Sequence, residues 1–246
     1  MTKLIGRWLE IHENEIGLFL WTCLLLFLVR SAGILLNNYA ETAFLKRFGV
    51  EYLPIVNMVN ALATFVVMGI VTGLMTRMAG ARLFTGLFVF CGFSVAAIRL
   101  LIPLGFDLIY PLLLMLKSQY EVLLALLFWN LANDMFNTRQ AKRLFPLITA
   151  GGVIGQILSS FATPWLARWL MLDNLLFVYL GTTLAGALVV GTMGRRFPNL
   201  FQKAAAGGKS GKQRTMFDQI KNVIPLIKQS TCLLYTSDAA DDLQPG

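Results

Sequence analysis

Three charged residues lie inside long apolar stretches, and their types and spacing could do chemistry. Arg30 lies within the first of these stretches, and Lys117 and Glu121 lie near the middle of a later one. An ionised side chain at the centre of a membrane helix costs about 2.5–3.5 kcal/mol on insertion scales, so such residues usually face a bundle interior or a water-filled cavity. We therefore treat all three as candidate substrate-binding residues, with the two cations attracting an anionic group.

A structural interpretation of the same charges stays open. Lys117 and Glu121 are four residues apart and share one helical face, so they are within reach of each other. They could form a neutralised pair that only packs, while Arg30 extends to the outer membrane interface. The residues alone do not separate a binding site from a packing pair.

The elements that must position these charges are membrane helices. Of 246 residues, 57% are hydrophobic and 14% charged, against about 45–50% and about 25% in soluble domains. Six stretches are long enough to cross about 30 Å of hydrocarbon, and none shows the alternation of a barrel strand. They cover residues 17–36, 54–76, 83–103, 106–131, 146–167 and 174–194. The predicted fold is all-α, with residues 1–194 forming a six-helix bundle in the lipid bilayer.

Basic residues alternate between the loops and predict the orientation. Fifteen of the 21 lysines and arginines lie before the first stretch, in every second loop or after the sixth stretch, and only three lie in the other loops. The positive-inside rule then places the amino terminus in the cytoplasm of a multi-pass protein of the cell (inner) membrane. The net charge of +8 is explained by these loops, so we expect no nucleic-acid partner.

The chain changes character after the sixth stretch. Residues 195–230 are predicted to be a basic cytoplasmic linker that turns amphipathic, as a chain does when it approaches a seventh helix. Residues 231–246 include CLLYTSDAADD, which is the translation of a transposase adapter used in preparing sequencing libraries. We expect this last segment not to be native, and the native protein to continue beyond residue 230.

Signatures of enzymes are nearly absent. The sequence contains no cluster of histidines and cysteines for a metal and no set of nucleophile, base and orienting residue, so we predict no catalytic residue, metal or cofactor. Two other patterns have structural explanations. Gly151, Gly155 and Ser159 recur every four residues, which is typical of close helix packing in membranes. A basic cluster consists of Arg139, Lys142 and Arg143. In the simplest interpretation, these residues fix the orientation of the chain in the membrane.

The segment Phe128–Ser160 resembles the ATP/ADP translocase family, the nucleotide carriers of plastids and obligate intracellular bacteria, and their bacterial relatives. The resemblance rests on a Phe-Trp pair, an Ala-Asn pair, an Ala-Lys-Arg run, a Phe-Pro-Leu run and a glycine-rich helix. These are Phe128, Trp129, Ala132, Asn133, Ala141, Lys142, Arg143, Phe145, Pro146, Leu147, Gly151 and Gly155. Gln140 stands where those carriers have glutamate. The resemblance adds an anion-steering role for the basic cluster to its topological one.

The resemblance also implies a fold of the major facilitator superfamily. The segment Gly73–Arg82 resembles a loop of that superfamily. Such carriers have two six-helix halves, each built from two inverted three-helix repeats. The stretches with Arg30 and Lys117 begin the two repeats, and these helices line the central cavity in that superfamily. The expected function is secondary transport of an anionic solute, and its most specific form is nucleotide exchange. The expected mechanism is alternating access, in which this six-helix half moves against a missing carboxy-terminal half. The alternative is a non-transporting membrane sensor or scaffold that anchors a missing soluble domain.

Overall fold

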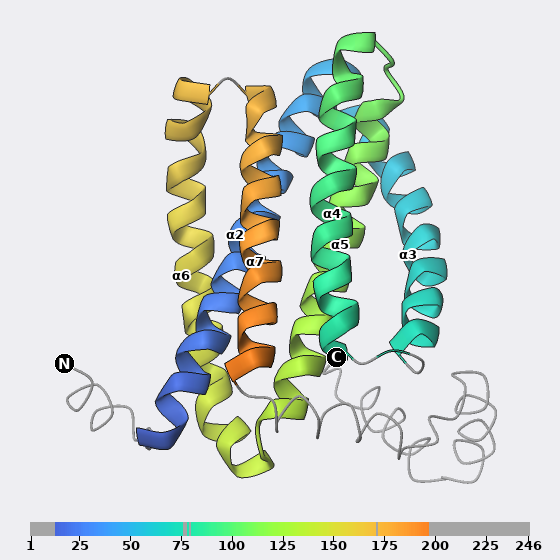
Figure 1. Ribbon diagram of the computed structural model, residues 1–246. Helices are drawn as coiled ribbons and strands as arrows, with labels where there is room; N and C mark the ends of the chain where they lie inside the picture. The colour runs from blue at the N-terminus through green and yellow to red at the C-terminus, as the bar shows by residue number, and fades with distance from the viewer. Residues whose placement is uncertain (1–12, 76–77, 79, 171, 197–246) are drawn as a thin grey trace, which may run out of the picture. The chain divides into compact units, whose positions relative to one another are not determined.

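The computed structural model describes residues 13–75, 78, 80–170 and 172–196, and these residues form six long helices and no β-strand (Figure 1). The long helices are α2 (Glu13–Phe48), α3 (Leu53–Met75), α4 (Gly80–Leu101), α5 (Ile109–Met135), α6 (Thr138–Leu170) and α7 (Leu175–Arg196). Each is long and apolar enough to cross a membrane. The predicted all-α six-helix membrane bundle is confirmed. The predicted linker beyond Arg196 and the adapter-like segment lie outside the described residues.

Helix α2 continues for three further turns beyond the predicted end of its membrane stretch at residue 36. The continuation has an apolar face that repeats with helical spacing, because Tyr39, Ala40 and Phe44 are all buried in the bundle. Asn37 and Glu41 lie among them and lower the local hydropathy, so a search for continuous apolar residues ends too early. This extension places Glu41 on the same helix as Arg30.

Helix α6 begins eight residues before Pro146, at which the predicted membrane stretch begins. Asn137 precedes the helix, and its carbonyl accepts the first helical hydrogen bond from Ala141 at 2.8 Å. The Gln140 side chain accepts a hydrogen bond from the Asn137 backbone N–H at 3.0 Å, which satisfies a donor at the helix start. This cap stabilises a helix start before the proline, and α6 continues through Pro146 although the proline lacks a backbone N–H.

Helix α2 lies at the centre of the bundle and packs against α5, α6 and α7. Helix α4 packs against α5 and α7, and α3 packs mainly against α5. Exchanging the first three helices with the last three maps these pairs onto one another: α2–α6 becomes α5–α3, and α2–α7 becomes α5–α4. Successive helices run in opposite directions, so α2 and α5 are antiparallel (Figure 1). The contact pattern is therefore that of two inverted three-helix repeats.

The contact between α2 and α6 is closest at small residues of α6. A Cβ added to Gly155 would lie 3.0 Å from the Phe27 backbone oxygen, and one added to Gly152 would lie 2.8 Å from the Leu26 side chain. At Gly151 the corresponding nearest atom, in Cys23, is 3.5 Å away, which is an ordinary contact. Ser159 is buried one turn further along. Gly152, which the four-residue pattern omits, thus meets its neighbour more closely than Gly151.

Helix α3 lies at the margin, and Val71 is its buried residue. A buried amide of α5 holds it in place. Gln119 Nε2 donates to Asn60 Oδ1 and to Thr64 Oγ1, both at 2.7 Å, and lies 3.3 Å from the Asn60 backbone oxygen. Because lipid offers no competing hydrogen bonds, these contacts fix α3 against α5 although little of its apolar surface is covered.

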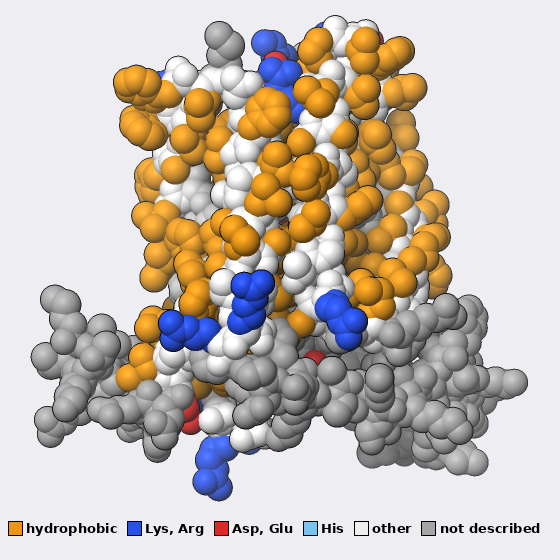
Figure 2. All heavy atoms as spheres, in the orientation of Figure 1, with side chains coloured by type: hydrophobic (Ala, Val, Ile, Leu, Met, Phe, Trp, Pro, Cys, Tyr) orange, Lys and Arg blue, Asp and Glu red, His pale blue; other side chains and the backbone are white. Residues whose placement is uncertain are grey.

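The two ends of the bundle differ in charge. The end where α2 begins and α7 ends carries exposed basic residues, which among the described residues are Arg82, Arg139, Lys142, Arg195 and Arg196. We call it the basic end. The opposite end carries the exposed Lys46, Arg47 and Arg168 and, in the last turn of α4, the half-buried Arg99. On the face drawn in Figure 2, hydrophobic side chains cover the middle of the helices, and Lys and Arg side chains lie towards both ends.

Candidate functional site

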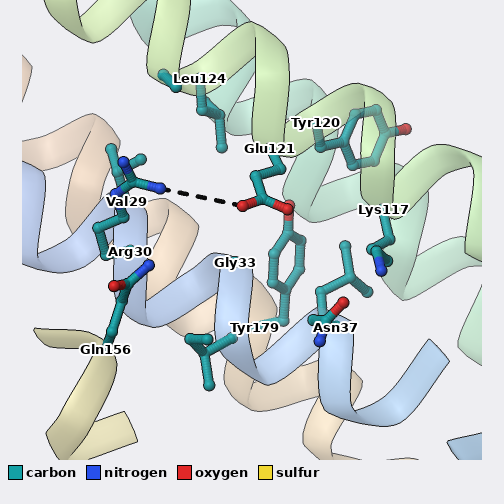
Figure 3. Close-up of a pocket in the computed structure, with 13 residues that line it drawn as sticks. Val29, Arg30, Gly33, Asn37, Lys117, Tyr120, Glu121, Leu124, Gln156 and Tyr179 are labelled. Carbon is teal, nitrogen blue, oxygen red and sulfur yellow. Dashed lines mark ion pairs between the residues drawn. The ribbon is translucent and has the colours of Figure 1, made fainter. Parts of the chain in front are cut away.

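A cavity of about 180 Å³ lies between α2, α5, α6 and α7 (Figure 3). It lies where the two hydrophobic core clusters of the bundle meet: Val29 and Leu124 belong to one cluster, and Leu36 and Tyr179 to the other. Arg30, Lys117 and Glu121 all line it. The structure thus brings the three candidate charges to one cavity, halfway along the central helices.

Arg30 and Glu121 face each other across the cavity. Arg30 Nη1 lies 4.0 Å from Glu121 Oε1, a distance at the outer limit of an ion pair (Figure 3). Glu121 remains 51% exposed and Arg30 32% exposed. The alternative in which Arg30 extends to the outer interface does not hold, because its guanidinium points into the cavity. The loose contact leaves donors of Arg30 available to a third group.

Lys117 forms its ion pair with a residue that sequence reasoning missed. Lys117 Nζ lies 2.8 Å from Glu41 Oε1, and the lysine is only 13% exposed. The Lys117–Glu121 pair of the structural interpretation therefore does not form. Side chains one turn apart can meet on a bare helix, but here each is opposed by an opposite charge on α2. Contact between α2 and α5 decides the partners.

The order of the charges along the two helices allows both ion pairs to form together. Arg30 and Glu41 are eleven residues apart, which is about three turns and returns to the same face of α2. Lys117 and Glu121 are one turn apart on α5, and the two helices are antiparallel. The order Arg30–Glu41 along α2 therefore matches the order Glu121–Lys117 along α5, so that each cation faces an anion. Because the two positions lie about 16.5 Å apart on α2 and about 6 Å apart on α5, the long side chains lean towards each other to make the contacts.

Neutral polar residues complete the cavity wall. Asn37 of α2, Gln156 of α6 and Tyr179 of α7 line it together with the charges (Figure 3). The sequence contains a signal for Asn37, which lies seven residues after Arg30 and thus on the same helical face, but the predicted stretch ended at residue 36. Gln156 and Tyr179 have no comparable signal, since one interfacial amide or tyrosine in a membrane helix is common.

The basic cluster lies at the basic end and does not line the cavity. Arg139 and Lys142 are exposed. Arg143 pairs with Glu15 at the start of α2, and Gln140 donates to the same carboxylate at 2.8 Å. Glu15 thus joins α6 to α2, and Gln140 contributes an amide donor to this contact.

Polar contacts also close the opposite end. Arg47 Nη1 lies 2.7 Å from Asp107 Oδ1, and its guanidinium lies over the ring of Tyr110. Tyr39 donates from its hydroxyl to Asp173 Oδ1 at 2.9 Å, which ties α2 to the turn before α7. Both ties join α2 to an element that lines the cavity, so they hold its walls in register.

Residues 97–183 match the family model described as TLC ATP/ADP transporter. Comparison with curated proteins and with solved structures gave no match. The matched segment contains every cavity residue that α5, α6 and α7 contribute. It also contains the segment Phe128–Ser160, on which the sequence resemblance rests. About a third of the chain is therefore similar to a family of nucleotide transporters.

Proposed function

We propose that this chain is one half of a secondary transporter for an anionic solute, with exchange of nucleotides as its specific form. The observation that carries the proposal is the cavity halfway along the bundle, which Arg30 and Lys117 line. A cation buried in a membrane bundle is costly and marks a binding or translocation site by default. An anion attracted there meets an effective dielectric nearer 20 than 80, so each charge acts more strongly than at a surface.

The inverted contact pattern supports alternating access. In carriers built from inverted repeats, the substrate lies near the midplane at the repeat interface, and one bundle rocks against another. Helices α2 and α5 occupy equivalent places in the two repeats, and between them they provide all the charges of the cavity. The cavity volume, about 180 Å³, is below the roughly 300–1,000 Å³ of a complete small-molecule site. We infer that a second bundle, beyond residue 230 in the native protein, provides the opposite wall.

The family match narrows the solute, because the family it describes transports ATP and ADP. The orientation belongs to the same proposal: the basic end would face the cytoplasm by the positive-inside rule. Arg139 and Lys142, exposed at that end, would steer a phosphate towards the cavity. In this mechanism Arg30 and Lys117 bind the anionic group, and Glu121 and Glu41 neutralise them when no anion is bound.

Binding of radiolabelled ADP to the 246-residue chain in lipid nanodiscs tests the proposal. We expect Arg30→Gln and Lys117→Gln each to weaken binding about tenfold, since each removes one charged contact. Arg168→Gln, at an exposed position outside the cavity, serves as the matched control and should bind as the unsubstituted chain does. Equal binding by all variants would remove the cavity as the anion site. Absence of binding by the unsubstituted chain would show that the cavity of this bundle by itself holds no anion.

A further inference from the structure

A half-buried arginine at the end opposite the basic end has no carboxylate partner. The half-buried cations within the described residues are Arg30, Arg99, Lys117 and Arg143. Three of them form the ion pairs described above, whereas Arg99 forms none with a carboxylate of the described part of the chain. Partial burial weakens the hydration of a cation, so buried charges are normally paired. Arg99 is therefore the place where this bundle lacks a counter-charge.

The contacts of Arg99, which lies in the last turn of α4, come from the start of α7. Its Nη2 donates to Asn174 Oδ1 at 3.2 Å, and its Cζ lies 5.9 Å from the centre of the Phe177 ring. Its Nε is buried and has no hydrogen-bond partner among the residues that the structure describes. A guanidinium has five N–H donors, so most of the hydrogen-bonding capacity of this one is unused.

The two aspartates described at this end have other partners. Asp173 lies next to Asn174 in the chain, but its Oδ1 accepts the hydrogen bond of Tyr39 at 2.9 Å. Asp107 pairs with Arg47 at 2.7 Å. Neither carboxylate lies within ion-pair distance of Arg99. The missing counter-charge is therefore not provided by a neighbouring aspartate, and Arg99 keeps its attraction for an external anion.

Outward-facing apolar side chains flank Arg99. Leu100 of α4 is 70% exposed, and Phe177 of α7 is 46% exposed. A cation in the last turn of a membrane helix extends to the level of the lipid head groups. Basic pockets between membrane helices bind such head groups. A lipid whose head group reaches Arg99 would cover Leu100 and Phe177 with its acyl chains.

From these observations we infer that Arg99 binds a phosphate group, at a site separate from the charged cavity. The planar fork of a guanidinium matches two phosphate oxygens, and Asn174 orients this fork from the start of α7. A phospholipid head group and a phosphate dissolved in water offer the same chemistry, and the flanking apolar side chains favour the lipid. The inference does not depend on the proposed function, because Arg99 does not line the cavity.

Thermal unfolding of the 246-residue chain in dodecyl maltoside, with and without added probe, tests the site. The lipid probe is phosphatidylglycerol, and its control is a galactosyl diacylglycerol with the same acyl chains but no phosphate. We expect phosphatidylglycerol to raise the melting temperature by about 2–4 °C and the galactolipid to leave it unchanged. Inorganic phosphate, compared with chloride at equal ionic strength, forms the second arm. A rise with inorganic phosphate alone would support a site for a dissolved phosphate.

Substitutions then assign the rise to Arg99. Arg99→Gln should abolish it, and Arg99→Lys should keep only part of it, because lysine retains the charge without the fork. Arg168→Gln is the matched control at an exposed cation of the same end and should keep the rise. Tyr39→Phe breaks the neighbouring bond to Asp173, so it should lower the melting temperature itself and still keep the rise. Arg30→Gln should also keep it, which separates this site from the cavity.

Three results would overturn the inference. An undiminished rise in Arg99→Gln, or in Arg99→Lys if the glutamine variant does not fold, would place the phosphate elsewhere. An equal rise with the galactolipid would show that acyl chains alone stabilise the bundle. No rise with either phosphate probe would show that water satisfies Arg99. None of these results decides the proposed function, which is tested by anion binding at Arg30 and Lys117.

Discussion

Lys117 Nζ lies 2.8 Å from Glu41 Oε1, so the cation of α5 is held by a carboxylate of α2 and not by Glu121 one turn away. Glu41 is 49% exposed, whereas Lys117 is nearly buried. An anion that binds Lys117 must therefore compete with Glu41, which can turn towards water at modest cost. The arrangement makes Glu41 a built-in competitor of the solute.

Replacement of Glu41 by Gln is expected to strengthen the binding of pyrophosphate about three- to tenfold. The change frees Lys117 from its counter-ion, while the amide oxygen can still accept a hydrogen bond. Titration of the chain in nanodiscs measures the effect, with Glu51→Gln as a control at an exposed acidic residue outside the cavity. Unchanged affinity, in a chain whose Lys117→Gln variant binds more weakly, would show that Glu41 does not compete.

Replacement of Gly155 by Ala is expected to destabilise the bundle by about 1–3 kcal/mol. The added methyl group would lie 3.0 Å from the Phe27 carbonyl oxygen and 3.1 Å from its Cα, and the backbone of α2 cannot move aside locally. Gly181 of α7 has no atom within 4 Å of the same position, so Gly181→Ala should be neutral or stabilising. Thermal unfolding of both variants in detergent decides the matter, and equal melting temperatures would contradict close α2–α6 packing.

Replacement of Gln119 by Leu is expected to lower stability by about 1–2 kcal/mol, because it leaves Asn60 and Thr64 of α3 without their donor. The double variant Gln119→Leu with Asn60→Leu should recover part of the loss, since exchanging both partners for apolar groups is nearly neutral. Limited proteolysis in the connection between α3 and α4 reports the loosening of α3. Protection equal to that of the unsubstituted chain would show that lipid contact alone holds α3.

Cysteine labelling tests the orientation. In a chain whose three cysteines are replaced, Lys46→Cys should react with an impermeant maleimide on intact cells, and Lys142→Cys only after permeabilisation. Both positions are exposed and lie at opposite ends of the bundle. Labelling of Lys142→Cys alone on intact cells would invert the orientation, and labelling of both would contradict the odd number of crossings between them.

Much of the fold could be predicted from the sequence, because the bilayer imposes a one-dimensional constraint. A helix must be apolar for about 20 residues to cross it, and that length is visible without knowing any neighbour. All six stretches are helices in the structure. The errors lie at the ends, where α2 and α6 leave the hydrocarbon and side-chain contacts take over: Tyr39 and Phe44 extend α2, and the Asn137–Gln140 cap starts α6 early.

The sequence by itself also determined that Arg30, Lys117 and Glu121 must avoid lipid, since the cost of a charge in hydrocarbon depends on its depth alone. Which partners they take was decided only by the tertiary structure. Pairing depends on the register of α2 against α5, which follows from the packing of the whole helices. In that register Lys117 pairs with Glu41, and Glu121 pairs with Arg30. It also brings Tyr179 of α7 to the same cavity, because contacts between helices far apart in the chain leave no spacing pattern in the sequence.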